Sequence, residues 1–136
     1  MARHLIVLLI LLTAGCAAAP PADLSGPAYP ETAAKLGSLD IEVIVGEQSI
    51  TINSGIARDF GRVNVWLNQW FMMPIESLGK GERLTLPLLS FRNAYGAAPR
   101  VGGFFATRQR DEIVLAEIET EQGIYGLRIA GERGLR

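Results

Sequence analysis

The chain has 136 residues, with 13 basic and 14 acidic side chains, a formal net charge of −1 and 49% hydrophobic residues. This length suits one domain, and the apolar fraction is sufficient to build its core. The nearly balanced charge excludes a strongly basic nucleic-acid-binding surface, so we expect no nucleic-acid partner. The single cysteine excludes a disulfide within the chain.

The N-terminus has the pattern of a secretory signal. Arg3 and His4 give a short positive segment, and residues 5–12 form an uninterrupted apolar run. A helix that crosses a bilayer core of about 30 Å needs roughly 20 apolar residues, so this run is too short to be a permanent span. A short apolar run followed by small residues predicts a cleavable signal peptide over residues 1–15.

The end of this segment, Thr13-Ala14-Gly15-Cys16, resembles the lipobox of bacterial lipoproteins. Ala14, Gly15 and Cys16 match the pattern, and Thr13 stands where leucine is preferred. The resemblance implies that Cys16 receives diacylglycerol, that the signal is removed and that the new N-terminus is acylated, for example with palmitate. Ala17 replaces the aspartate that favours retention in the inner membrane, which implies an outer-membrane anchor facing the periplasm. The alternative is a buried N-terminal helix with Cys16 in the core.

Little catalytic chemistry remains after this processing. It removes His4 and consumes the thiol of Cys16, which excludes a Cys/His zinc site, a thiol nucleophile and a histidine-based triad in the mature protein. No Asp-rich loop suits Ca²⁺. Glu117, Glu119 and Glu121 have strand spacing, and we interpret them as one solvated face. We assign no catalytic residue, metal ligand or cofactor.

The remaining chain divides into residues 16–37, the lipidated cysteine with an Ala/Pro-rich tether, residues 38–131, the folded domain, and residues 132–136, a C-terminal tail. Within the domain, short apolar or alternating runs predict seven or eight strands. Pro74 and Pro87 interrupt two of these runs, which places them on edge strands, at strand ends or at bulges. The runs cover residues 39–45, 50–53, 63–68, 70–75, 84–88, 104–107, 113–118 and 125–129.

This pattern predicts an all-β fold: a small antiparallel β-sandwich of the immunoglobulin-like kind, or a partly open barrel. Residues 50–88 loosely resemble immunoglobulin-like modules of bacterial envelope lipoproteins. The resemblance rests on Asn53-Ser54-Gly55, on residues 63–68 and on Leu78-Gly79-Lys80-Gly81-Glu82. It implies a sandwich and no particular activity, because such folds carry many functions.

Two groups of residues are candidates for binding. In the first, Asn64, Trp66 and Asn68 share one strand face and Trp70 lies nearby. Amide hydrogen bonds beside an indole suit a glycan or a peptide edge. The alternative is that Trp66 is buried against a second layer of the sandwich.

The second group lies on the long irregular stretch 91–99, where Arg92 and Tyr95 are the candidate binding residues. Loops on a rigid scaffold commonly carry binding residues. The alternative for Arg92 is a solvated surface without a ligand.

We therefore expect a lipid-anchored, non-catalytic module of the cell envelope that binds or supports another envelope component, either a protein or a glycan. Three alternatives remain open at this point. In the first, the protein binds a glycan or peptide as an accessory to an envelope enzyme. In the second it is a weak hydrolase that uses carboxylates or the Ser77/Lys80 pair, and in the third it is an assembly factor that pairs through an exposed strand edge.

Overall fold

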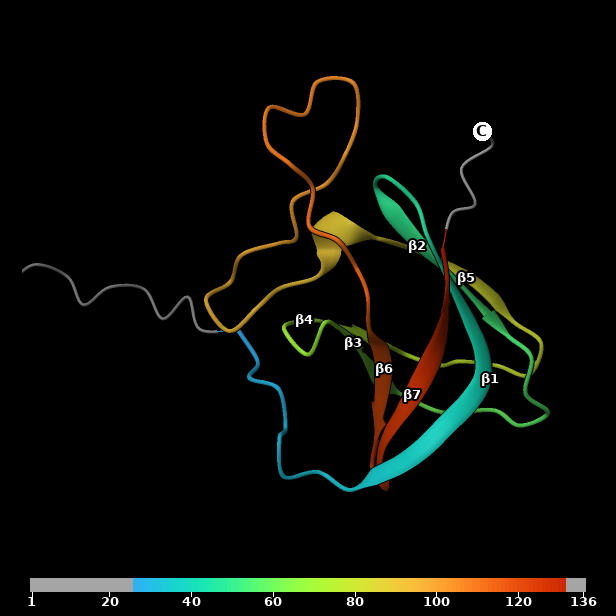
Figure 1. The fold of residues 1–136 in the computed structure, drawn as a ribbon. Helices are drawn as coiled ribbons and strands as arrows, with labels where there is room; N and C mark the ends of the chain where they lie inside the picture. The colour runs from blue at the N-terminus through green and yellow to red at the C-terminus, as the bar shows by residue number, and fades with distance from the viewer. Residues whose placement is uncertain (1–25, 132–136) are drawn as a thin grey trace, which may run out of the picture.

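The computed structural model describes residues 26–131 as one small all-β domain (Figure 1). The predicted signal, Cys16, the tether up to residue 25 and the predicted tail 132–136 lie outside the described residues. Within this range no helix is long and apolar enough to cross a membrane. The elements are β1 (Lys35–Val45), β2 (Ser49–Ser54), β3 (Val63–Leu67), β4 (Phe71–Ile75), β5 (Arg83–Pro87), the 3₁₀-helix η2 (Leu88–Ser90), β6 (Ala116–Thr120) and β7 (Gly123–Ala130).

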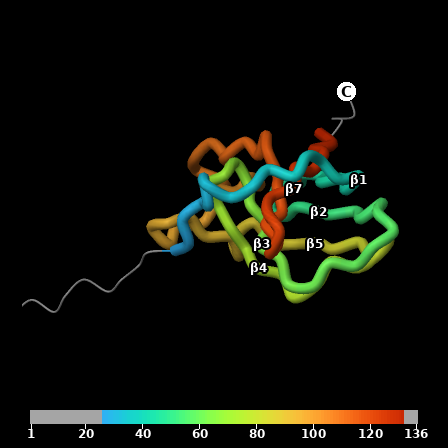
Figure 2. Tube along the Cα trace, turned by 90° about the horizontal axis from the view of Figure 1, so that it is seen from below, coloured from blue at the N-terminus to red at the C-terminus, as the bar shows by residue number. Residues whose placement is uncertain are grey.

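All seven strands belong to one sheet, in the order β4-β3-β6-β7-β1-β2-β5. The sheet curls strongly into a half-barrel (Figures 1 and 2). The predicted all-β class is confirmed, and of the two predicted architectures the chain adopts the partly open barrel. A single curled sheet can bury its concave face on itself, so a second sheet is not needed to cover the core.

One strand pair departs from the antiparallel expectation. β1 and β7 run parallel, whereas the other neighbouring strands are antiparallel. The register between β1 and β7 shifts at two places along the 11 residues of β1, and Gly37 near the first shift has a φ of 89°. Such irregularities bend a strand and increase its twist, which is how this central pair contributes to the curl of the sheet.

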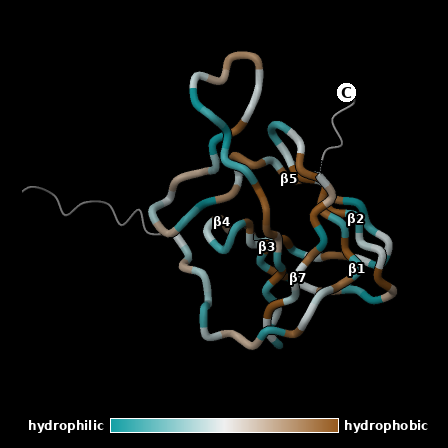
Figure 3. Tube along the Cα trace, viewed as in Figure 1, coloured by the Kyte–Doolittle hydropathy of each residue, from teal (hydrophilic) through white to brown (hydrophobic). Residues whose placement is uncertain are grey.

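The concave face holds the hydrophobic core. Alternate residues of the strands point inward, and Ile41, Val43, Ile52, Val65 and Ile118 are fully buried. In Figure 3 hydrophobic and hydrophilic residues follow one another along the strands, and the buried hydrophobic residues form one cluster. This period of two is the pattern from which the strands were predicted.

The two edge strands, β4 and β5, each contain one of the prolines discussed above. Pro74 and Pro87 lack the N–H that an interior strand would use, so these positions agree with the prediction. The edge of β4 is also paired at one point. The chain continues from β5 through η2, and Arg92 exchanges two backbone hydrogen bonds of 2.9 and 3.0 Å with Met72 of β4.

The largest differences from the predicted boundaries lie at the start of β1 and in the stretch before β6. β1 begins at Lys35, three residues before the expected start of the domain, because Ile124 N–H donates to the carbonyl of Ala34 at 2.8 Å and extends the pairing with β7. Residues 104–107 form no strand, and β6 begins at Ala116 rather than at 113. Residues 91–115 instead leave the sheet as a long irregular segment that projects from one side of the half-barrel (Figures 1 and 2).

Candidate functional site

The structure separates the first group of predicted binding residues. Asn64 and Trp66 lie on the convex face of β3, and the indole of Trp66 is only 1% exposed. Its Nε1–H donates to Oε2 of Glu119 on β6 at 2.7 Å, and Asn64 Nδ2 donates to the same oxygen at 3.2 Å. The ring of Tyr29 packs edge-on against the indole, with 5.2 Å between the centroids. Trp66 is thus enclosed, and the cover is the N-terminal segment rather than a second sheet.

The N-terminal segment is held by a polar cluster around Glu117 of β6, which is 7% exposed. Tyr29 Oη donates to Oε2 of Glu117 at 2.8 Å, and Nζ of Lys35 lies 3.4 Å from Oε1. Lys35 Nζ also donates to the Tyr29 hydroxyl. Burial raises the pKa of the Tyr29 hydroxyl, and the neighbouring Glu117 raises it further, while Lys35 opposes the shift. The pKa of Lys35 is raised chiefly by its hydrogen bond to Tyr29.

This cluster corrects one expectation from the sequence. Glu117 and Glu119 lie on β6 and are not exposed, whereas the exposed Glu121 lies in the turn after the strand. The carboxylates of Glu117 and Glu119 are engaged by Tyr29, Lys35 and Trp66. Because these hydrogen bonds satisfy the carboxylates within the domain, we interpret the cluster as the attachment of residues 26–34 to the sheet.

The side chain of Asn68 joins the turn between β3 and β4 to the end of the long irregular segment. Its φ is 54°, as is that of Gln69, and such positive values are required at the two central positions of a tight hairpin turn. The side-chain Nδ2 of Asn68 donates to the carbonyl of Glu112 at 2.8 Å, and its Oδ1 accepts from the N–H groups of Val114 and Leu115 at 2.9 and 3.2 Å. The amide therefore fixes the end of the long irregular segment to the hairpin.

Trp70 and Tyr95 form an exposed aromatic pair beside the β3–β4 turn. Their rings lie 5.9 Å apart at 50°, and the two residues are 47% and 73% exposed. The sequence placed them in separate candidate groups, and the fold brings them together because the irregular segment returns beside the β3–β4 hairpin. Arg92, from the second group, does not join this pair. Its Nη1 donates to the carbonyls of Leu89 and Phe91, and these hydrogen bonds stabilise the loop that carries it.

Trp70 borders a cleft of about 580 Å³ between the hairpin and the irregular segment. Arg100 and Asp111 line its polar side, and Arg100 donates to the Asp111 carboxylate through Nη2 at 2.7 Å, Nε at 3.1 Å and its backbone N–H at 2.8 Å. These hydrogen bonds from the Arg100 side chain and backbone hold the pKa of Asp111 below its usual range. The other lining residues are Asn68, Phe71, Asn93, Ala97, Ala98, Arg108 and Glu112.

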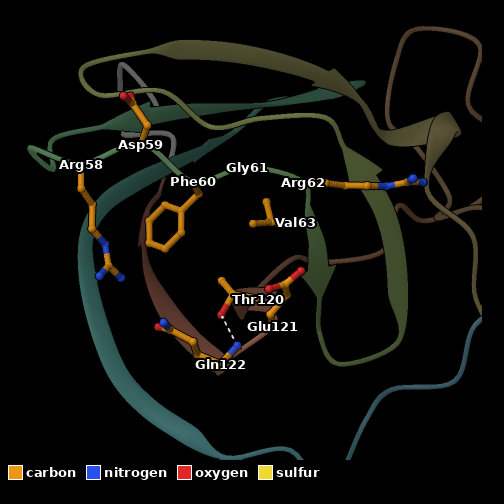
Figure 4. Close-up of a pocket in the computed structure, with 9 residues that line it drawn as sticks. All are labelled: Arg58, Asp59, Phe60, Gly61, Arg62, Val63, Thr120, Glu121 and Gln122. Atoms are coloured by element: carbon orange, nitrogen blue, oxygen red, sulfur yellow. Dashed lines mark hydrogen bonds between the residues drawn. The ribbon is translucent and has the colours of Figure 1, made fainter.

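A second cleft, of about 370 Å³, lies between the loop 58–63 and the β6–β7 turn (Figure 4). Arg58 and Phe60 lie on one side of it, and Thr120 and Gln122 on the other. The guanidinium of Arg58 lies 4.4 Å from the Phe60 centroid and donates to the Tyr125 hydroxyl at 3.1 Å. Its charge is therefore engaged within the domain, as that of Arg100 is in the first cleft. The second cleft has no exposed aromatic ring comparable to Trp70, which makes it the weaker candidate for a ligand.

The remaining chemical candidates are not assembled into a site. Ser77 and Lys80 are both exposed, and within residues 26–131 no hydrogen bond joins them. Lys80 is instead fixed through its backbone N–H, which donates to Asp59 at 2.5 Å. In the described part of the chain, no three His, Cys, Asp or Glu side chains gather as a metal-binding group. The predicted lipidation site, Cys16, lies outside this part.

Comparisons of the chain with models of protein families, with curated proteins and with solved structures found no match.

Proposed function

We propose that the protein is a lipid-anchored, non-catalytic binding module of the bacterial cell envelope. Its anchor is Cys16, which lies at the end of a short apolar run and after the small residues Ala14 and Gly15. The attachment is to the outer membrane with the domain facing the periplasm, as the lipobox resemblance and Ala17 imply. Two or more acyl chains on one residue hold a protein firmly on a bilayer, whereas a single chain binds only marginally.

The ligand that fits the domain best is a glycan, bound at the aromatic pair Trp70–Tyr95. The observation that carries this proposal is the position of the exposed Trp70 in a cleft that the Arg100–Asp111 pair also lines. Sugar rings combine apolar C–H faces with hydroxyl groups. An aromatic face suits the former, and a guanidinium beside a carboxylate offers donors and acceptors to the latter.

The anchor is tested by metabolic labelling with a palmitate analogue in a bacterial host. The wild-type chain is expected to incorporate the label and to fractionate with outer membranes. Cys16→Ser is expected to lose the label, because the hydroxyl does not replace the thiol as the acceptor of diacylglycerol. Incorporation that persists in Cys16→Ser would contradict the assignment of the anchor.

The ligand is tested by co-sedimentation of the purified protein with peptidoglycan sacculi and by calorimetric titration with soluble muropeptides. Trp70→Ala and Tyr95→Ala are each expected to weaken binding roughly tenfold or more, the scale expected when one buried aromatic contact is lost. Leu89→Ala is the matched control, since it removes a 56% exposed apolar side chain outside the cleft. Equal binding by all variants would refute the site, and binding that depends on the peptide stems alone would make the ligand a peptide.

A further inference from the structure

The most exposed large apolar side chains of the described domain are Phe104 and Phe105, at 94% and 89%. They are the two central residues of a turn that is closed by Ala106 N–H, which donates to the carbonyl of Gly103 at 3.1 Å. Gly103 has a φ of 134°, a value that favours glycine. The two rings pack edge to face, 5.0 Å apart. The backbone therefore displays two adjacent phenyl rings at the tip of a projecting loop.

The base of this loop is firmly closed. Asp111 N–H donates to the carbonyl of Arg100 at 3.0 Å, and the side chains of the same two residues form the ion pair described above. Gly102 N–H adds a hydrogen bond of 3.0 Å to the carbonyl of Glu47 in the β1–β2 turn. Residues 101–110 thus form a loop whose ends meet at the sheet, which is an arrangement often found in functional loops.

The loop is cationic as well as apolar. Between the paired Arg100 and Asp111, the sequence contains Arg108 and Arg110 and no carboxylate. Both arginines are exposed. In Figure 3 the tip of the loop is coloured toward the hydrophobic end of the scale, and the chain that returns from it is hydrophilic. Apolar rings at a tip with arginines behind them match the layers of an anionic bilayer surface, where acyl chains lie beneath phosphate groups.

The chain enters the described domain beside residues 91–99, the part of the irregular segment that precedes this loop. Gly26, the first described residue, donates its N–H to the carbonyl of Ala94 at 2.7 Å, in the irregular segment that also carries Tyr95 and the Phe104–Phe105 loop (Figures 1 and 2). Nine residues separate Cys16 from Gly26. This length spans at most about 36 Å when fully extended. A lipid on Cys16 would therefore keep the base of the irregular segment within this distance of the bilayer.

We propose that residues 101–110 form a membrane-contacting loop, in which Phe104 and Phe105 enter the interface of an anionic phospholipid bilayer while Arg108 and Arg110 bind its phosphates. The inference deepens the proposed function, since it rests on the anchor at Cys16 to hold the loop at the membrane. It assigns the orientation of the domain: the cleft that Trp70 lines lies beside the bilayer, and the β4–β5 turn faces away from it.

The test uses the processed full-length protein, carrying an environment-sensitive fluorophore on Phe104→Cys, in vesicles that contain phosphatidylglycerol. The label is expected to shift its emission to shorter wavelength, to be quenched by brominated acyl chains and to lose most of its quenching by aqueous iodide. Lys80→Cys, at the exposed β4–β5 turn, is the matched control and is expected to keep its aqueous emission. Replacing both Arg108 and Arg110 by Gln in the Phe104→Cys protein is expected to weaken the contact by roughly fivefold per arginine.

The outcomes separate this inference from the proposed function. If palmitate labelling succeeds and the fluorophore at position 104 stays as accessible to iodide as that at 80, the loop proposal is overturned and the anchor stands. If palmitate labelling fails, the loop is tested on the unanchored chain by adding phosphatidylglycerol vesicles, and a blue shift specific to position 104 still supports it. A blue shift that grows with protein concentration without vesicles would identify a second copy as the occupant and overturn the membrane assignment.

Discussion

Trp66 and Trp70 lie four residues apart and have opposite roles. Trp66 is enclosed by Tyr29 and donates to Glu119, whereas Trp70 is half exposed beside Tyr95. The difference arises from their surroundings and not from the strand pattern. Trp66 lies within β3, where Tyr29 of the N-terminal segment packs on it, and Trp70 lies at the end of the β3–β4 turn.

The substitution Trp66→Phe tests the structural role of the buried indole. It removes the donor to Glu119 Oε2 and leaves the carboxylate with fewer partners under the N-terminal segment. We expect the free energy of unfolding to fall by about 1–3 kcal/mol, measured by urea denaturation. Trp70→Phe is the matched control and is expected to change stability by no more than about 0.5 kcal/mol. A larger loss in Trp70→Phe than in Trp66→Phe would contradict this assignment.

Asp111 provides a prediction about pH. Because hydrogen bonds from Arg100 lower its pKa in the folded state, its ionised form stabilises the fold above the unfolded-state pKa, about 3.9, and this contribution is lost as pH falls through the lower folded-state pKa. The difference in unfolding free energy between the wild type and Asp111→Asn should be constant above about pH 5 and should shrink below pH 4. Urea denaturation between pH 2 and 7 measures it. If this difference in unfolding free energy stayed unchanged down to pH 2, the hydrogen bonds from Arg100 would not lower the pKa of Asp111.

At the scale of elements, the parallel contact between β1 and β7 depends on a close backbone approach at Gly123. This residue has a φ of 146°, and a Cβ there would lie 2.4 Å from the carbonyl oxygen of Ala34. The same carbonyl accepts the hydrogen bond from Ile124 that begins the pairing. A side chain at position 123 would therefore disturb both the β6–β7 turn and the start of β1.

Gly123→Ala is expected to lower the free energy of unfolding by at least roughly 1–3 kcal/mol, from the unfavourable backbone conformation alone, with the steric overlap adding to it. Gly61→Ala is the control, because a Cβ there meets no atom within 4 Å and its φ is not positive. That variant should be neutral or slightly stabilising through reduced freedom of the unfolded chain. Chemical denaturation measures the unfolding free energy of both variants. Equal values for Gly123→Ala and Gly61→Ala would contradict the prediction, because they would mean that the backbone at the β1–β7 contact accommodates a Cβ without loss of stability.

The whole molecule is organised around its centre rather than its ends. β7, β1 and β6 each have neighbours on both sides, while β4 and β5 have only one strand neighbour each. Strands whose backbone groups pair on both sides open less often than edge strands. The Phe104–Phe105 loop lies outside this sheet, so it can be presented to a bilayer without exposing the core.

We therefore expect the amide hydrogens of β1, β6 and β7 to exchange most slowly with solvent. Those of β5 and residues 101–110 should exchange fastest, with β4 intermediate because Met72 pairs with Arg92. Hydrogen exchange followed by NMR on the purified protein measures this order. Protection of β5 equal to that of β7 would indicate that the open edge is covered, for example by a second copy.

Features of the site that depend on neighbouring residues could be predicted from the sequence, whereas contacts between residues far apart in the chain could not. The strand positions followed from local alternation, and the placement of Trp70 and Tyr95 as candidates followed from residue type. The burial of Glu117 could not be inferred, because its partners Tyr29 and Lys35 are 88 and 82 positions away in the chain. The Phe104–Phe105 turn was interpreted as a strand, since two aromatics beside Thr107 have strand propensity and only the absence of a neighbouring strand excludes it.

The amino-acid sequence by itself determined the all-β class and the alternation of the clearest strands, and it restricted Pro74 and Pro87 to edge strands, strand ends or bulges, because these depend on periodicity and on the missing proline N–H. The tertiary structure decided that one curled sheet replaces a sandwich, that β1 and β7 pair in parallel and that the N-terminal segment covers Trp66 and leaves Trp70 exposed. These features arise between segments far apart in the chain, where pairing depends on which surfaces meet after the chain has folded.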